Sequence, residues 1–288
     1  MPVPSRLRVT LARPSETIAG VGLHSGRPAT IQILPASSGA GLVFVDSPSR
    51  QEIAAVARNV IDTSRCTQLG FGGSVIQTVE HVLSALAGCG VDDALIVSSG
   101  GEAPAVDGSA LPFVTAIRTA GLVPVPNSSS APLTVDAPKL FTAGDSVILV
   151  EPSDRFRATV VLDYPNHSYI GTQVFRYDSG EMAYDTEVAP SRTYGFLHEV
   201  EALRAHGLAL GASEENALVL GADEYLGDRR FGDELARHKM LDLIGDLALA
   251  GRPVIAKITA IKPGHAANTM LARALSSTGH THNGCSGE

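Results

Sequence analysis

His238, Asp242 and Asp246 recur at intervals of four residues along one stretch of the chain. On an α-helix this spacing places their side chains on one face, one turn apart, while the apolar residues between them can pack against a core. An imidazole and a carboxylate placed in this way can bind one metal ion, but they can equally form a hydrogen bond on a helix surface. Two ligands do not make a metal site, so a third ligand and a proton-transfer group are needed elsewhere.

Glu80 and His81 are the strongest candidates for the missing groups. Adjacent residues of a helix point about 100° apart, so both side chains can face one cleft while their apolar neighbours pack inward. Alone, such a pair is more often a solvated helix face. Together with His238 and Asp242, however, His81 completes three nitrogen and oxygen ligands, which is the composition of a catalytic zinc site with one coordination position open to water.

Two short motifs carry further side chains with useful chemistry. His265 follows a glycine turn at residues 262–265, where an imidazole could donate a proton to a leaving group, although an ordinary histidine at a helix start is the simpler interpretation. Thr193 and Tyr194 offer a hydroxyl and an aromatic face suited to a sugar, or else mark the end of a strand.

The glycine-rich run at residues 20–26 (GVGLHSG) lacks the spacing of a dinucleotide-binding loop, and no P-loop lysine follows it. We therefore expect a β-hairpin turn at this position. His24, inside the run, either belongs to the turn or lines a site, and the sequence leaves both possibilities open.

The elements that must position these residues occur in a repeated order. The first part of the chain has β-structure at residues 8–44, a helix from about Thr78, which could cap it, and a helix at residues 111–120. The second part has strands at residues 133–175, helical segments near 196–206 and 230–250, a strand at 254–261 and a final helix from His265.

Between the two parts lies a proline- and serine-rich run without periodicity, at residues 123–132, which is the best candidate for a linker. We expect an α+β fold with a first domain at residues 1–122 and a second at 133–288. The repeated order suggests that the two domains have similar topology, although no sequence identity between them is visible.

Composition excludes several classes of protein. Of the 288 residues, 44% are apolar and 18% are charged, against a usual charged fraction of about 25%, and the net charge is −8. This balance argues against disordered or nucleic-acid-binding tails, and the absence of tryptophan makes a base-stacking surface improbable. We therefore expect no nucleic-acid partner.

Cysteine usage and hydropathy indicate the compartment. The three cysteines, Cys66, Cys89 and Cys285, have no close pairing in the sequence, which fits a reducing cytosol. No apolar run approaches the about 18 residues that a membrane span needs. We expect a cytoplasmic protein, with at most peripheral membrane contact, and a solvated tail in which His280 and His282 could bind metal only adventitiously.

Taken in order, the motifs resemble those of the zinc-dependent UDP-3-O-acyl-N-acetylglucosamine deacetylases of bacterial lipid A synthesis. The resemblance extends from about Glu16 to Leu275 and is specific only in combination. The matching segments are residues 20–26, 78–88 (TVEHVLSALAG), 106–113, 192–196 (RTYGF), 207–217, 230–246 and 262–268 (KPGHAAN).

The resemblance implies a role for each candidate of the metal centre. The family's zinc ligands fall on His81, His238 and Asp242, with one zinc ion per chain. Glu80 matches the general base that activates the zinc-bound water for attack on the N-acetyl amide, and His265 matches the general acid that protonates the departing amine.

The remaining catalytic and substrate-binding roles are also implied by the family. Thr193 would stabilise the oxyanion, and Asp246 would orient His265 and favour its charged form. Lys239 and Lys262 would contact the nucleotide, with Tyr194 and Tyr164 as further substrate contacts. Arg230 and Arg237 lie nearby in the sequence and could add positive charge for the diphosphate.

The family also implies how the chain folds and where the acyl group lies. Its two domains each place a helix layer against a sheet, and the helices are sandwiched between the sheets. A βαβ insert supplies the acyl channel, for which residues 209–220 are our candidate segment. One departure is Asp93, where the family commonly has asparagine, so a structural hydrogen bond there is expected to differ.

Two other functions remain open from the sequence. A zinc amidohydrolase acting on another acylated amine would keep the metal and change the substrate. A non-catalytic protein that binds a nucleotide sugar would use its histidines structurally. Metal content and the release of acetate discriminate among the three.

Overall fold

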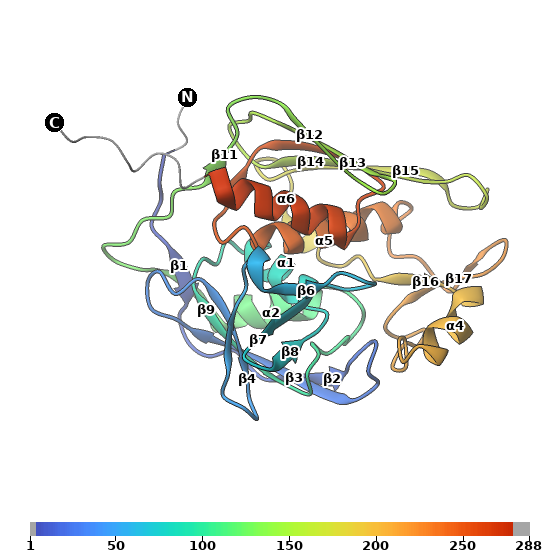
Figure 1. Ribbon diagram of the computed structural model, residues 1–288, viewed down its shortest axis with the longest axis horizontal. Coiled ribbons are helices and arrows are strands. Elements are labelled where there is room, and N and C mark those ends of the chain that lie inside the picture. The colour runs from blue at the N-terminus through green and yellow to red at the C-terminus, as the bar shows by residue number, and fades with distance from the viewer. Residues whose placement is uncertain (1–3, 279–288) are drawn as a thin grey trace.

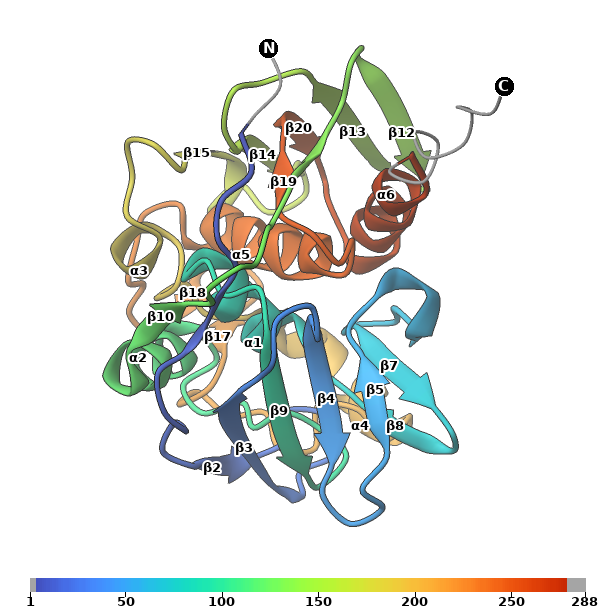
Figure 2. The ribbon, with the colours of Figure 1, turned by 90° about the vertical axis from the view of Figure 1, so that its left-hand side faces the viewer.

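The computed structural model describes residues 4–278, and each half of this part of the chain contains a five-stranded sheet with helices on its inner side. The helices of the two halves meet in the middle of the molecule, between the sheets (Figure 1). A side view shows the same layers, with α1 and α5 adjacent (Figure 2). This is the α+β sandwich that the sequence predicted.

The first half consists, in chain order, of β1 (Val9–Leu11), β2 (Ile18–Val21), β3 (Pro28–Pro35), β4 (Leu42–Asp46), β5 (Glu52–Ala54), a 3₁₀ turn (Ala57–Asn59), β6 (Val60–Asp62), β7 (Gln68–Phe71), β8 (Ser74–Ile76), α1 (Glu80–Gly88), β9 (Ala94–Ser99), α2 (Leu111–Ala120) and β10 (Leu122–Pro124). The predicted hairpin turn at residues 20–26 joins the antiparallel strands β2 and β3.

The second half consists of β11 (Leu133–Thr134), β12 (Lys139–Ala143), β13 (Ser146–Glu151), β14 (Arg157–Tyr164), β15 (Gly171–Asp178), α3 (Tyr184–Glu187), β16 (Tyr194–Phe196), a 3₁₀ turn (Leu197–Glu199), α4 (Val200–Ala205), β17 (Leu218–Leu220), β18 (Tyr225–Leu226), α5 (Glu234–Ala248), β19 (Val254–Ile255), β20 (Lys257–Ile261) and α6 (His265–Thr278).

The two main sheets have the same topology. Their strand orders are β2-β3-β9-β4-β5 and β12-β13-β20-β14-β15. In each sheet, the strand that follows the central helix is inserted between the second and third strands and runs parallel to the third, whereas the other neighbours are antiparallel. The prediction of two similar α+β units is confirmed in this respect, while their boundaries at 1–122 and 133–288 stay a prediction.

The central contact of the molecule is between α1 and α5, and it depends on a small residue. A Cβ atom at Gly245 of α5 would lie 2.1 Å from the carbonyl oxygen of Glu80 in α1, so any side chain there would push the helices apart. One turn away, Ser84 donates a hydrogen bond to the carbonyl oxygen of Leu241 (2.7 Å). The close approach brings the first residues of α1 beside the middle of α5.

The prediction that Thr78 caps α1 is wrong. The helix begins at Glu80, and no side chain caps it. Thr78 has a positive φ of 55°, and its hydroxyl donates to the Glu102 carboxylate (3.0 Å) instead of accepting a hydrogen bond from the first turn of the helix. The Thr78 side chain therefore links the start of α1 to the loop that contains Glu102.

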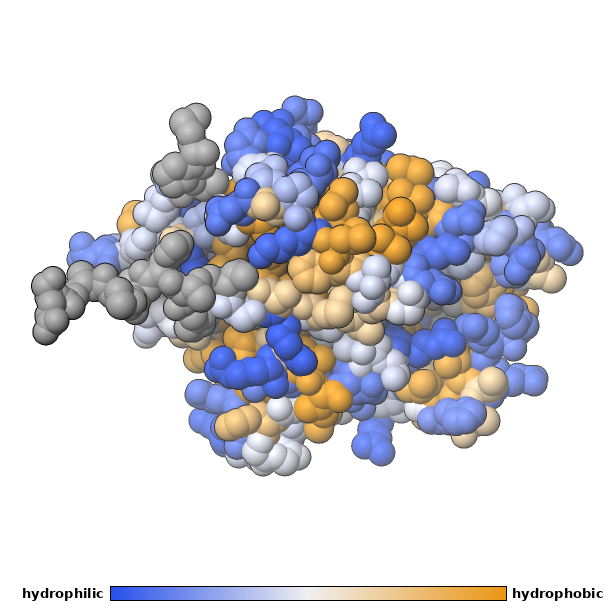
Figure 3. Space-filling view, turned by 45° about the horizontal axis from the view of Figure 1, so that its top comes forward, coloured by the Kyte–Doolittle hydropathy of each residue, from blue (hydrophilic) through white to orange (hydrophobic). Residues whose placement is uncertain are grey.

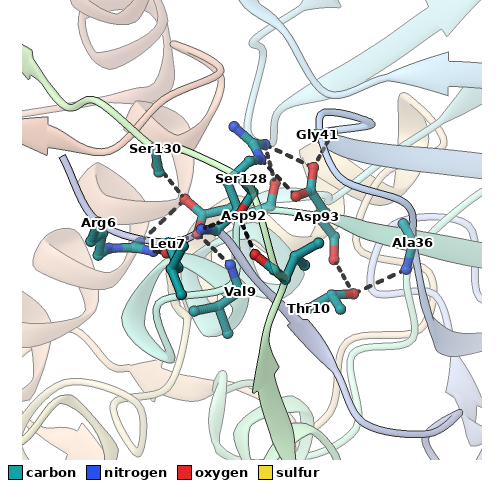
Figure 4. A network of polar contacts seen from close by, with 12 residues as sticks. Arg6, Leu7, Val9, Thr10, Ala36, Gly41, Asp92, Asp93, Ser128 and Ser130 are labelled. Carbon is teal, nitrogen blue, oxygen red and sulfur yellow. Dashed lines mark hydrogen bonds and ion pairs between the residues drawn. The ribbon is translucent and has the colours of Figure 1, made fainter.

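The predicted linker is held to the N-terminal segment through two adjacent carboxylates (Figure 4). Asp92 accepts hydrogen bonds from Arg6 and from the hydroxyl of Ser130, which lies in the linker. Asp93 accepts two hydrogen bonds from Arg8 (2.6 and 2.7 Å) and is fully buried. Asp93, the departure from the family pattern, therefore has a cationic partner within the same chain.

The outer face of the second sheet has no helix over it among residues 4–278. Its exposed apolar side chains include Leu140, Val174 and Ile261. Apolar side chains gathered among polar ones are visible when this side is turned forward (Figure 3). Within the described residues, no helix has both the length and the hydrophobicity that crossing a membrane requires.

Candidate active site

A cavity of about 250 Å³ opens where the start of α1 faces the middle of α5. Both halves of the chain contribute to its wall. The lining residues are Leu23, His24, Arg65, Thr78, Glu80, His81, Tyr164, Thr193, Tyr194, Gly195, Phe196, Glu199, His238, Lys239, Asp242 and His265.

His81, His238 and Asp242 form a buried cluster whose possible ligand atoms all lie within 4.8 Å of one another. The Asp242 Oδ1 atom is 3.4 Å from His238 Nε2 and 3.9 Å from His81 Nε2. Because all three side chains are buried, the interpretation of His238 and Asp242 as a hydrogen-bonded pair on a helix surface is wrong.

The protonation of this cluster suits a cation. Burial lowers the pKa of His81 to about 4 and that of His238 to about 3, so both imidazoles are neutral near pH 7 and keep a lone pair for a metal. His238 Nδ1 lies 3.3 Å from the carbonyl oxygen of Ser191, which fixes the proton on Nδ1 and leaves Nε2 facing the cluster.

Asp242 supplies the negative charge of the cluster. Burial opposes its ionisation, but neighbouring cationic groups, Lys239 and His265 among them, outweigh that effect and hold the pKa of Asp242 below its usual range. Its Oδ2 atom accepts a hydrogen bond from Lys239 Nζ (2.8 Å), whereas its buried Oδ1 atom has no hydrogen-bond partner. A buried carboxylate oxygen without a donor is the group that a bound cation would satisfy.

Glu80 lies beside the cluster and is almost fully buried. Burial raises the pKa of its carboxyl group to about 8. Its Oε2 atom accepts a hydrogen bond from the backbone N–H of Thr67 (3.0 Å), and its Oε1 atom lies 3.9 Å from His265 Nε2. A carboxyl group and an imidazole therefore face each other across a short gap.

His265 begins α6 and is held by Asp246 of α5. The distance from His265 Nδ1 to Asp246 Oδ2 is 2.9 Å. Burial opposes a positive charge on the imidazole, but the attraction of Asp246 is among the effects that outweigh it and raise the pKa of His265 to about 9. Asp246 itself is fully buried behind the histidine and does not line the cavity.

Comparison with known families assigns the chain to one of them. Residues 8–277 match the model of the family described as LpxC, UDP-3-O-acyl N-acetylglycosamine deacetylase. The chain belongs to this deacetylase family.

Curated relatives agree with that assignment, and each is named UDP-3-O-acyl-N-acetylglucosamine deacetylase. The protein of Anaeromyxobacter dehalogenans (strain 2CP-C) is 44% identical over 256 residues, which cover 88% of this chain and 82% of the relative. That of Leptospira biflexa serovar Patoc (strain Patoc 1 / Ames) is 40% identical over 267 residues, which cover 91% of this chain and 88% of the relative. That of Myxococcus xanthus (strain DK1622) is 42% identical over 264 residues, or 89% and 82%.

In this family member, the substrate-binding candidates of the sequence divide into two groups. Tyr194, Tyr164 and Lys239 line the cavity, as does the catalytic candidate Thr193. The two tyrosine hydroxyls are hydrogen-bonded to each other (2.9 Å), and Lys239 Nζ lies 5.6 Å from the centre of the Tyr194 ring. Lys262 precedes His265 in the chain but is not among the lining residues.

Two arginines expected to add charge to the site have structural partners instead. Arg230 pairs with Asp107 (2.9 Å) and Arg237 with Glu187 (2.9 Å) and Asp233 (2.7 Å). Neither arginine lines the cavity. A count of nearby cations in the sequence could not reveal these pairings, because Asp107 and Glu187 lie far from them in the chain.

Several lining residues were missed or left undecided. His24 lines the cavity, so it is a site residue as well as a turn residue; burial lowers its pKa, and its Nε2 atom has no hydrogen-bond partner. Arg65 and Glu199 form an ion pair (2.9 Å) at the rim. Neither Arg65 nor Glu199 belongs to a motif that the sequence singled out.

The candidate acyl-channel segment at residues 209–220 is part of a longer structural unit. Strands β16 and β17 are parallel and are joined through α4, which makes a βαβ unit from Tyr194 to Leu220. The sequence candidate at 209–220 covers only the part of this unit after the helix. The earlier part contains the helical segment expected near 196–206 and the strand end expected at Thr193 and Tyr194, but the sequence did not join them to this candidate.

Proposed function

We propose that this protein removes the N-acetyl group of UDP-3-O-acyl-N-acetylglucosamine by hydrolysis and releases acetate, as a step of lipid A biosynthesis. The observation that carries the proposal is the buried His81, His238 and Asp242 cluster, flanked by a carboxyl group and an imidazole. Membership of the deacetylase family supports the substrate. The reaction class is hydrolysis of a carbon–nitrogen bond other than a peptide bond.

The three residues of the cluster would hold one zinc ion per chain. Two neutral imidazoles and a carboxylate fit a catalytic zinc site, which has three protein ligands of this kind and keeps one position open. When bound, the zinc ion acts as a Lewis acid that lowers the pKa of water to roughly 7 and polarises a carbonyl group.

Glu80 is placed to act as the general base. Because burial raises its pKa to about 8, its carboxylate has a proton affinity matched to neutral or slightly alkaline conditions. It would take the proton of the water that attacks the acetyl carbonyl. The hydroxyl of Thr193, which also lines the cavity, would donate to the oxyanion that this attack creates.

His265 is placed to act as the general acid. With a pKa of about 9, its imidazole is protonated at neutral pH and can donate the Nε2 proton to the departing amine. Asp246 orients the ring through Nδ1 and stabilises the positive charge. A cation held beside Glu80 would favour its carboxylate form, so that Glu80 can accept a proton while His265 still holds one.

The nucleotide would be held at the second-half side of the cavity. Lys239 offers a charge for the diphosphate, and Tyr194 and Tyr164 offer aromatic faces for the sugar or the base. Lys262 lies outside the cavity wall, so its contact with the nucleotide requires that the substrate extends beyond the cavity. We place the enzyme in the cytoplasm because Cys66 and Cys89 are free buried thiols, and we expect only peripheral membrane contact.

The direct test is to incubate purified protein with UDP-3-O-acyl-N-acetylglucosamine and measure free acetate, with metal content measured on the same sample. We expect acetate release, about one zinc per chain, and loss of both in His238→Ala. Acetate from simple N-acetylglucosamine but not from the acylated nucleotide would favour a different amidohydrolase. Protein that binds the nucleotide sugar, holds no zinc and releases no acetate would favour a binding protein.

A further inference from the structure

Thr67 lies between β6 and β7 and is completely buried, outside the cavity wall. All of its polar groups are engaged. Its hydroxyl donates to Asp246 Oδ1 (2.6 Å), its backbone N–H donates to Glu80 Oε2 (3.0 Å), and its carbonyl oxygen accepts from the N–H of Val79 (3.3 Å). One residue of the first half therefore touches both the carboxylate beside the metal cluster and the carboxylate behind His265.

These contacts close a ring of four residues. Glu80 directs one oxygen to Thr67 and the other toward His265 Nε2, 3.9 Å away. Asp246 likewise directs one oxygen to Thr67 and the other to His265 Nδ1 (2.9 Å). Because a carboxylate is planar, fixing one oxygen restricts the direction of the other, so Thr67 limits the rotation of both acidic groups.

We propose that Thr67 is a positioning residue that sets the separation between Glu80 and His265 across the interface of the two halves. The inference rests on the proposed function, in which these two residues move protons. An attacking water and a departing amine must fit between them, and small errors in the position of reacting groups have large effects on rate. Thr67 acts through Asp246 and Glu80 and does not reach the substrate.

The ring has enough other contacts to survive loss of the Thr67 hydroxyl. Asp246 Oδ2 also accepts a hydrogen bond from Asn268 Nδ2 (3.0 Å), and the Thr67 N–H contact with Glu80 belongs to the backbone. Thr67→Val keeps the shape of the side chain and both backbone contacts. It frees only Asp246 Oδ1, so the carboxylate can rotate about its remaining partners without unfolding the chain.

For the purified zinc-containing enzyme, we expect Thr67→Val to lower kcat by about 10- to 100-fold, as is usual for residues that orient functional groups. KM and zinc content should stay close to those of the wild type, because the cavity wall is unchanged. Thr67→Ser restores the hydroxyl and should recover most of kcat. A valine variant with the wild-type kcat, or a serine variant as slow as valine, would overturn the inference.

Thr10→Val is the matched control for the loss of a buried hydroxyl. Thr10 donates to the carbonyl oxygen of Asp93 (2.8 Å) and lies in the N-terminal strand β1, on the linker network and away from the cavity wall. The Thr10→Val substitution should lower the melting temperature and leave kcat unchanged. If Thr10→Val lowered kcat as much as Thr67→Val, the effect of Thr67 would be one of general stability, and the inference would fail.

A second measurement does not depend on activity. In crystal structures of wild type and Thr67→Val, we expect the Asp246 carboxylate to rotate and the distance from Glu80 Oε1 to His265 Nε2 to change in the variant alone. An unchanged ring in the variant would overturn the inference. If the wild type released no acetate, the proposed function would fail, whereas these structures would still decide whether Thr67 sets the gap.

Discussion

At the scale of single residues, the site depends on side chains whose proton affinities are altered by burial and by neighbouring charge. Glu80 and His265 both hold a proton more tightly than they would in water, whereas His81 and His238 hold one less tightly. The first pair is suited to moving protons and the second to binding a cation. Histidines of one site therefore differ in proton affinity because of their surroundings.

Substitutions can distinguish the proposed role of Glu80 from that of the proposed metal ligands. We expect Glu80→Ala to lower kcat by about 10²- to 10⁴-fold, the usual contribution of a general base, with zinc content near that of the wild type. His238→Ala should instead lose the zinc. Metal analysis and acetate release on the same preparations make the distinction, and loss of zinc from Glu80→Ala would mean that Glu80 is a ligand.

The activity should depend on pH with a bell shape. Glu80 must lose its proton to act as a base, so kcat/KM rises through the pKa of Glu80, which is about 8 without a cation. His265 must keep its proton, so kcat/KM falls as the pH passes about 9. A cation beside Glu80 favours the carboxylate and moves the acid limb below pH 8.

The measurement is kcat/KM across neutral and alkaline pH, for the wild type and for Asp246→Asn. Loss of the Asp246 charge should lower the pKa of His265 and move the alkaline limb to lower pH. An alkaline limb that stays in place in Asp246→Asn would assign that limb to another group.

At the scale of elements, the site depends on how closely α1 approaches α5. His81 lies in the first turn of α1, and His238 and Asp242 lie in α5, so the spacing of these three possible metal ligands follows the separation of the two helices. Gly245 permits the contact, since a Cβ atom there would lie 2.1 Å from a carbonyl oxygen of α1. The same glycine lies between Asp242 and Asp246 on the helix.

Gly245→Ala should therefore destabilise the protein, although alanine favours helices in general. We expect the free energy of unfolding to fall by about 1–3 kcal/mol, as for other overpacked interiors, and the zinc affinity to fall as the helices separate. Gly232→Ala is the matched control, because an added Cβ atom there meets nothing within 4 Å. Equal stability and zinc affinity in both variants would show that the helix contact tolerates a methyl group.

At the scale of the whole molecule, the N-terminal segment and the linker are joined to the first half by the Asp92 and Asp93 network (Figure 4). Asp93 is fully buried, and it accepts hydrogen bonds from Arg8 and from the backbone N–H of Gly41 (2.8 Å). The network lies in the region where β1 and the linker meet, apart from the residues that line the cavity. It should therefore affect stability and leave the chemistry unchanged.

Asp93→Asn tests that separation. The amide keeps the shape and loses the charge that pairs with Arg8, so we expect the free energy of unfolding to fall by about 1.5–3 kcal/mol, the range for hydrogen bonds to charged groups. Zinc content and kcat should not change. Denaturant unfolding and acetate release measure the two effects, and a large fall in kcat without loss of stability would contradict this assignment.

The sequence by itself determined many of the elements and most of the candidate residues that line the cavity. Alternation of apolar residues predicted the strands, and the four-residue spacing of His238, Asp242 and Asp246 predicted one face of α5. The helix at residues 111–120 was predicted with its observed limits. These features depend on neighbours along the chain, so a local pattern is enough to reveal them.

Only the tertiary structure decided which polar residues meet. Thr67 carried no signal in the sequence, yet it contacts both Glu80 and Asp246. Arg237 was expected to add charge for the substrate, but it pairs with Glu187 within the protein. Thr78 resembled a helix cap and binds another loop instead. Each outcome depends on a partner that is not a neighbour in the chain and that the fold brings alongside. For Thr67, this requires that α1 and α5 pack together and bury both halves of the site.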